Sequence, residues 1–303
     1  MSEIYHDHSG AGHARTAIAL GLPHCLECDA VVQAHVASVG YAQRASRPFA
    51  RLWRALQVCV CLTLLCHCGA SRPGANVDSI SHGSFTDVRV FRPAGHPREL
   101  VLVLSGDGGW GTPVEEIAQR LAARGSLVAG IDARTWLAHL EEADTSCVAP
   151  GAYLADLGHF LAARYGAADV PPLLIGHSAG ATLAYVALAQ GRRGAYAGLV
   201  TLAFCTDLEL RRALCPGGQL KLAPEPGGAR LLPGGELGAH WISLHGLEDR
   251  ECPAAADRVF AEAVPGTRFV PLPGVGHSYR EPAEWWDAFT AARNALAAGG
   301  GGT

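Results

Sequence analysis

Apolar runs alternate with segments of helical periodicity along most of this chain. The predicted strands lie at 85–91, 99–105, 126–132, 170–175, 198–204, 241–245 and 268–272. Most are continuous apolar runs, typical of strands buried on both faces, whereas 85–91 alternates apolar and polar residues and predicts an outer strand. Strands that alternate with helices indicate the α/β class, with a mostly parallel sheet and helices on both faces.

The helices are predicted from apolar residues three and four positions apart. One covers about 150–165, and the last runs through Trp285 and Ala292. Another opens at Thr112-Pro113-Val114-Glu115, where the threonine is the expected cap and the glutamate closes a capping box. Residues 216–239 are rich in glycine and proline without a period, and they predict a long surface loop, a candidate flap over a site.

The first 75 residues differ from the rest. Arginines at 44, 47, 51 and 54 precede the apolar run 55–66, and the small residues Gly69-Ala70-Ser71 follow. This order predicts a secretory signal with cleavage after Ala70, and the apolar run is too short to span a bilayer comfortably. We therefore expect a leader over 1–75, disordered or removed, and a single domain over 76–303 in the periplasm. A lipoprotein, or a chain tethered by an uncleaved signal, is the lesser alternative.

Charge and cysteine content narrow the class further. The net charge of −4 offers no basic field for nucleic acid. The cysteines of the expected mature chain are Cys147, Cys205, Cys215 and Cys252, an even number that predicts two disulfides with three pairings open. Cys25 and Cys28 form a C-x-x-C pair, but no second pair completes a metal site, so none is predicted. No cofactor is expected either. No feature sets the oligomeric state.

Residues Gly176-His177-Ser178-Ala179-Gly180 carry the most specific chemical signal. They lie between a buried strand and the apolar helix 181–189, the context in which G-x-S-x-G forms a nucleophile elbow. Small residues on either side of the serine let strand and helix approach closely. The alternative is an ordinary strand-to-helix turn in which Ser178 caps the helix.

A serine hydroxyl needs a base within reach, and the base needs an orienting carboxylate. In α/β-hydrolases the chain order is serine, acid, histidine. Asp249 and His277 both follow predicted strands in that order, so Asp249 is the expected acid and His277 the expected base. Glu248 or Asp207 is the alternative acid, and His177 is expected to pack or to tune the site.

An oxyanion hole requires two backbone N–H groups. Ala179, directly after the serine, is expected to supply one. The glycine-rich loop 105–110 supplies the other, and the Asp107 N–H is favoured. A phosphate-binding loop is the alternative, but this segment lacks the lysine and the glycine spacing of those motifs.

The segment Ser105-Gly106-Asp107-Gly108-Gly109-Trp110, the elbow, the Gly246-x-x-Asp249 turn and the Leu272-to-His277 segment together resemble the bacterial virulence protein VirJ family, the AcvB/VirJ group, over about 85–292. The resemblance implies a periplasmic α/β-hydrolase that returns lysyl-phosphatidylglycerol to phosphatidylglycerol and lysine. By position it implies Ser178 as nucleophile, Asp249 as acid and His277 as base. His177 departs from the family, where an aromatic residue more often precedes the serine.

The leading hypothesis is therefore an exported serine hydrolase that cleaves a small-molecule or lipid ester, the lipid at a membrane surface, with no transmembrane helix in the mature chain. A general carboxylesterase or lipase is one alternative. A non-catalytic virulence or secretion accessory protein on a hydrolase scaffold is another. For substrate binding, Trp110 is the candidate wall on the acyl or lipid side. Candidate partners for a lysyl ammonium group are Asp107, Glu115, Glu116 and Asp207.

Overall fold

The computed structural model describes residues 76–167 and 170–299. The predicted leader, with its signal segment and the Cys25/Cys28 pair, lies outside these residues, and its boundary at residue 75 stays a prediction. The described residues belong to one compact unit. Among the described residues, no helix is both long enough and apolar enough to cross a bilayer.

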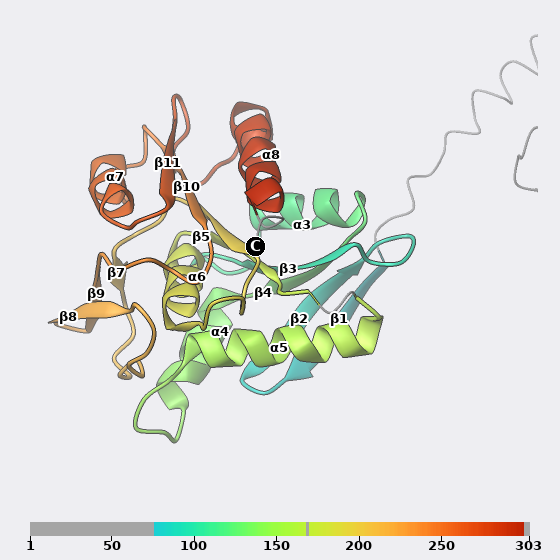
Figure 1. The fold of residues 1–303 in the computed structure, drawn as a ribbon, viewed down its shortest axis with the longest axis horizontal. Helices are drawn as coiled ribbons and strands as arrows, with labels where there is room; N and C mark the ends of the chain where they lie inside the picture. Colours follow the sequence, from blue (N-terminus) through green and yellow to red (C-terminus); the bar gives the residue numbers. More distant parts are fainter. Residues whose placement is uncertain (1–75, 168–169, 300–303) are drawn as a thin grey trace, which may run out of the picture. The chain divides into compact units, whose positions relative to one another are not determined.

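A large sheet of eight strands runs through the described part of the chain, in the order β1-β2-β4-β3-β5-β6-β10-β11 (Figure 1). The strands are β1 (Asn76–His82), β2 (Phe85–Arg92), β3 (Glu99–Leu104), β4 (Ser126–Ile131), β5 (Leu173–His177), β6 (Gly198–Leu202), β10 (Trp241–Gly246) and β11 (Thr267–Leu272). The strands from β4 to β11 pair in parallel, and β1 and β2 join antiparallel at one end. The prediction of a mostly parallel sheet is confirmed.

The strand order reverses at β3, because β4 lies on one side of β3 and β5 on the other. The loops that leave the carboxyl ends of β3 and β5 are therefore free to diverge from each other. In open α/β sheets, ligands bind at such a switch point. The loop 105–110 leaves β3 at this point, and Ser178 leaves β5.

Helices cover both faces of the sheet. They are α3 (Val114–Ala122), α4 (Ala133–Glu142), α5 (Pro150–Tyr165), α6 (Ala179–Gln190), α7 (Ala254–Glu262) and α8 (Pro282–Gly299). Along β3, Leu100 and Leu102 pack with α4, α5 and α6 on one face, and Val101 and Val103 pack with α3 and α8 on the other (Figure 1). The continuous apolar runs thus correspond to strands buried on both sides.

The prediction of a loop over 216–239 is wrong. The segment holds the hairpin of β8 (Lys221–Glu225) and β9 (Gly228–Leu232), which forms a three-stranded sheet with β7 (Asp207–Leu208). Pro226 and Gly227 make the turn, and Gly227 adopts a φ of +86° that favours glycine. The turn residues dominate the composition of this short hairpin and mask the weak alternation of its strands.

Two other local predictions are also wrong. Thr112 does not cap the helix, because α3 begins after Pro113 and its N-terminus has no side-chain cap; Glu115 instead accepts hydrogen bonds from the Trp110 indole and the Gln119 amide. Strand β2 is not outermost, since the unpredicted β1 pairs with its free edge.

Within the described residues, two disulfides form as predicted. Cys147 pairs with Cys215, and Cys205 pairs with Cys252. The first joins the segment before α5 to the segment before β8. The second joins the segment after β6 to the segment after β10. The sequence left this pairing open.

Candidate active site

Ser178 stands at the sharp turn between β5 and α6, with φ 53° and ψ −126°. This strained backbone is held because strand and helix touch: a Cβ on Gly176 would collide with the carbonyl of Gly180, and one on Gly180 with the carbonyl of Ser105. Ser178 precedes the helix, but its side chain makes no capping hydrogen bond. The capping alternative is therefore wrong, and the hydroxyl is available for other contacts.

The structure brings Ser178, His277 and Asp249 together in one hydrogen-bonded line. The Ser178 hydroxyl lies 2.9 Å from His277 Nε2, and His277 Nδ1 lies 2.8 Å from Asp249 Oδ2. Since a carboxylate only accepts, Nδ1–H donates to Asp249, and Nε2 is left to accept the serine proton. This is the spatial arrangement that nucleophile activation requires.

The loop after β10 holds the acid. Asp249 is buried, and its Oδ1 accepts hydrogen bonds from the backbone N–H groups of Glu251 and Cys252, both at 2.9 Å. Cys252 is also fixed through its disulfide to Cys205. Each oxygen of the carboxylate thus has a defined partner, which fixes the plane of the carboxylate relative to His277.

The loop 105–110 lies directly against the serine. A Cβ on Gly106 would stand 3.2 Å from the Ser178 Cβ, so glycine permits this approach. In the described part of the chain, neither the Asp107 N–H nor the Ala179 N–H donates a hydrogen bond. The two predicted oxyanion donors are thus unpaired at the edge that carries Ser178, and their role stays a prediction.

Asp132, for which the sequence predicted no role, anchors this loop. It caps α4 by accepting from the Thr135 N–H at 3.0 Å, and it accepts from the Trp110 N–H at 2.9 Å. Burial opposes ionisation, but these backbone donors and the charge of Arg89 hold the pKa of Asp132 below its usual value. In the sequence, the position of Asp132 at the carboxyl end of β4, beside β3, indicated that it could contact the loop that leaves β3.

The predicted substrate-binding residues lie in different surroundings. The Trp110 indole packs over Gly130 and near Phe91 on the α3 side of the sheet, with ring centroids 6.1 Å apart. These contacts favour a packing role over contact with substrate. Asp207 is exposed on β7, two residues after Cys205.

The acidic residues of α3 already have partners. Glu115 binds Trp110 and Gln119, and Glu116 binds Arg120 at 2.5 Å. Glu251, missed in the sequence, is instead the carboxylate nearest the hydroxyl-facing nitrogen: its Oε2 lies 3.5 Å from His277 Nε2, and its side chain is 73% exposed. In the sequence, only its position two residues after the predicted acid Asp249 indicated that Glu251 could lie at the site.

His177 is buried behind the site and supports the histidine backbone. Its Nε2–H donates to the His277 carbonyl at 2.8 Å, and its ring meets Tyr279 edge-on. Burial lowers the pKa of His177 to about 4 from its ordinary 6.5, although the His277 carbonyl opposes this shift. The imidazole is therefore neutral at pH 7 and acts as a donor in the packing of the site.

This buried imidazole makes stability depend on pH. As pH falls from 6.5 to 4, the unfolded chain binds a proton at His177 that the folded chain excludes, so the free energy of unfolding drops by about 3 kcal/mol. The measurement is urea unfolding at pH 7 and pH 4. Between these pH values, the free energy of unfolding of His177→Gln is expected to fall by about 3 kcal/mol less than that of the wild type. The exposed His159→Gln is the control. Equal losses in wild type and His177→Gln would contradict the prediction.

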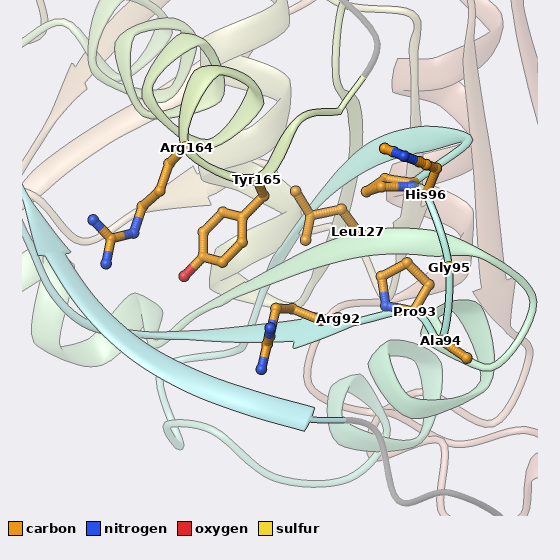
Figure 2. A pocket seen from close by; sticks show the side chains of 9 residues that line it. Arg92, Pro93, Ala94, Gly95, His96, Leu127, Arg164 and Tyr165 are labelled. Atoms are coloured by element: carbon orange, nitrogen blue, oxygen red, sulfur yellow. The ribbon is translucent and has the colours of Figure 1, made fainter.

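A cavity of about 520 Å³ lies away from Ser178, Asp249 and His277, none of which lines it (Figure 2). Arg92, His96 and Leu127 line it with Arg164 and Tyr165 from the end of α5, at the amino ends of β3 and β4. Ser178 follows the carboxyl end of β5, so this cavity belongs to the opposite edge of the sheet. Within the described residues, no group of three or more His, Cys, Asp or Glu side chains is arranged to hold a metal ion.

Comparison with solved structures shows that the fold is that of the α/β-hydrolases. Thermogutta terrifontis esterase 2, phosphoramylated by tabun, is 17% identical, with 75% of this chain and 95% of that chain covered and a TM-score of 0.51. TT1662 from Thermus thermophilus is 19% identical, with 73% and 98% covered and a TM-score of 0.50. At these identities the likeness is one of fold.

The family model of the bacterial virulence protein (VirJ) matches residues 98–211. This stretch contains the loop 105–110 and the serine elbow, and over it the match confirms the resemblance to the VirJ family. Asp249 and His277 lie beyond the matched residues. No curated protein sequence matches the chain.

Proposed function

We propose that this protein is a serine hydrolase that cleaves a carboxylic ester through an acyl-enzyme. The observation that carries the proposal is the Ser178–His277–Asp249 line, with distances of 2.9 and 2.8 Å, beside two unpaired backbone N–H groups. A nucleophile, a base and an oriented acid are the groups that acyl transfer requires. Thermogutta terrifontis esterase 2, named for ester cleavage, offers support from the same fold.

In the first half of the reaction, Ser178 Oγ forms a bond to the ester carbonyl carbon while His277 Nε2 takes the hydroxyl proton. The carbonyl oxygen becomes negative and accepts from the Asp107 and Ala179 N–H groups, each worth about 3 kcal/mol of barrier. The C–O bond to the alcohol then breaks, and the alcohol leaves with the proton from His277. Asp249 stabilises the imidazolium that forms between these steps.

In the second half, His277 takes a proton from water as the water oxygen attacks the acyl carbon. The bond to Ser178 breaks, and the serine recovers its proton from His277. The products are a carboxylic acid and an alcohol, and the enzyme returns to its starting state. All proton transfers use one imidazole nitrogen, so the reaction needs no group beyond the described residues and water.

The acyl group that we propose is an aminoacyl group carried by a lipid, lysyl-phosphatidylglycerol being the substrate that the VirJ resemblance implies. A lysyl ester carries ammonium groups, and carboxylates near the reacting atoms would favour its binding. Glu251 lies 3.5 Å from His277 Nε2, and Asp107 is exposed in the loop that touches Ser178. Of the four carboxylates expected from the sequence, Glu115 and Glu116 already have partners, which leaves Asp107 and Asp207.

We further propose export to the periplasm. The support is the predicted signal before residue 75 together with two disulfides, which persist in oxidising compartments.

Turnover of lysyl-phosphatidylglycerol is expected to exceed that of a neutral short-chain ester at equal concentration, because only the former pairs with the acidic groups of the site. Release of lysine and of p-nitrophenol from p-nitrophenyl butyrate would be measured with the same enzyme sample. Equal or faster turnover of the neutral ester would exclude the aminoacyl proposal and leave a general carboxylesterase. Failure of wild type to turn over either ester and to react with a fluorophosphonate would overturn the hydrolase proposal.

A further inference from the structure

His245 is a completely buried histidine that contacts the loop 247–253, which carries Asp249 and is here called the acid loop. It is the last residue but one of β10 and lies four positions before Asp249. The hydrolysis mechanism above does not use it. A titratable side chain with no exposure to water must have its polar atoms satisfied by protein groups, so its partners define what it does.

Both ring nitrogens of His245 have partners. Nε2 lies 2.7 Å from the carbonyl of Cys252 and 3.3 Å from Asp249 Oδ2. Nδ1 lies 2.6 Å from Asp257 Oδ2, on α7. A carbonyl and a carboxylate only accept, so Nε2 carries a proton and donates toward the acid loop.

A chain of side chains behind His245 holds Asp257 in place. The Trp241 indole N–H only donates, and it donates to the Thr201 hydroxyl at 2.9 Å. Thr201 then donates to Ser243 at 3.1 Å, and Ser243 donates to Asp257 Oδ2 at 2.6 Å. The direction of every bond in this chain is fixed, and the chain ends at Asp257 Oδ2, the oxygen that also binds His245.

The charges of this cluster support the same arrangement. Burial alone would lower the pKa of His245, but the hydrogen bond and charge of Asp257, the Cys252 carbonyl and the charge of Asp249 together raise it. A cationic His245 would lie between two buried carboxylates, Asp249 and Asp257. Its charge would offset the cost of burying the ionised Asp249.

The geometry points to His245 as a positioning residue for Asp249. Held by Asp257, it binds the carbonyl of Cys252, the residue whose N–H holds Asp249 Oδ1, and it also contacts Asp249 Oδ2. These contacts hold the acid loop in place, so that Asp249 Oδ2 keeps its hydrogen bond to His277 Nδ1. This inference rests on the proposed hydrolase function, because it assigns His245 a part in orienting the acid of that reaction.

A matched pair of variants separates positioning from simple burial. The amide nitrogen of Gln reaches the place of Nε2, whereas that of Asn reaches only the place of Nδ1. His245→Gln therefore keeps the donor to Cys252, and His245→Asn keeps only the contact with Asp257. With p-nitrophenyl butyrate we expect His245→Gln to keep kcat within about threefold, and His245→Asn to lose about 10- to 100-fold in kcat at unchanged KM.

Equal kcat values for folded Asn and Gln variants would overturn the positioning role. So would a loss confined to KM or to thermal stability. A wild type that neither hydrolyses the ester nor reacts with a fluorophosphonate would instead defeat the proposed function itself. If a variant fails to fold, the wild type still decides: nitrogen-15 NMR is expected to show a slowly exchanging proton on His245 Nε2 at pH 7, and an unprotonated Nε2 would overturn the inference.

Discussion

Ser178→Ala is expected to lose ester hydrolysis by at least about 10⁴-fold and to abolish labelling by a fluorophosphonate probe. The substitution removes the one oxygen that His277 faces at 2.9 Å. Because that oxygen caps nothing in α6, the melting temperature should stay close to that of the wild type. The measurements are kcat on p-nitrophenyl butyrate, intact-mass detection of the probe adduct, and thermal unfolding.

Ser126→Ala is the matched control for this experiment. Ser126 is as buried as Ser178, but it stands at the start of β4, at the opposite edge of the sheet. It should keep full activity and full labelling. A Ser178→Ala protein that still forms the adduct, or still turns over the ester at the wild-type rate, would show that another residue is the nucleophile.

The three residues of the proposed site were predictable because each follows a strand of the parallel part of the sheet. Parallel strands bring their carboxyl ends to one edge, so Ser178 after β5, Asp249 after β10 and His277 after β11 had to lie near one another. The glycines around Ser178 were readable as well, since close contact of strand and helix leaves no room for a side chain. Local chemistry and strand order were sufficient here.

What the sequence could not supply were contacts between elements. His245 and Asp257 lie on a strand and on the following helix, and nothing in their spacing shows that they bind each other at 2.6 Å. Likewise the disulfide partner of Cys252 depends on where the chain runs after β6. Apart from its place near the predicted acid, nothing in the sequence distinguishes Glu251 from other surface acids, because its contact with His277 is visible only in the structure.

The support around the acid suggests how sensitive the site is to small displacements. Asp249 receives hydrogen bonds from two backbone N–H groups, from His277 and, more weakly, from His245. These donors come from three separate segments of the chain, so the carboxylate can hold its orientation only while all three keep their places. Such an arrangement orients the imidazole before substrate arrives, at no cost during the reaction.

Asp249→Asn is expected to lower kcat by about 10³- to 10⁴-fold with little change in KM. Asparagine keeps the shape of the side chain and one oxygen, and this oxygen can still accept from the Glu251 and Cys252 N–H groups. Its amide nitrogen then faces His277 Nδ1, where two donors would meet. The imidazole must move its proton to Nε2, and it can no longer accept a proton from Ser178.

Asp156→Asn removes the same charge from an exposed position on α5 and should leave kcat unchanged, which controls for net charge. Fluorophosphonate labelling of Asp249→Asn is expected to slow in parallel with kcat, because both reactions need His277 to accept the serine proton. If Asp249→Asn instead kept kcat within tenfold of wild type, the acid would have to come from another residue. Glu248→Gln would then be the variant to lose activity, since Glu248 is the neighbouring carboxylate on the same loop.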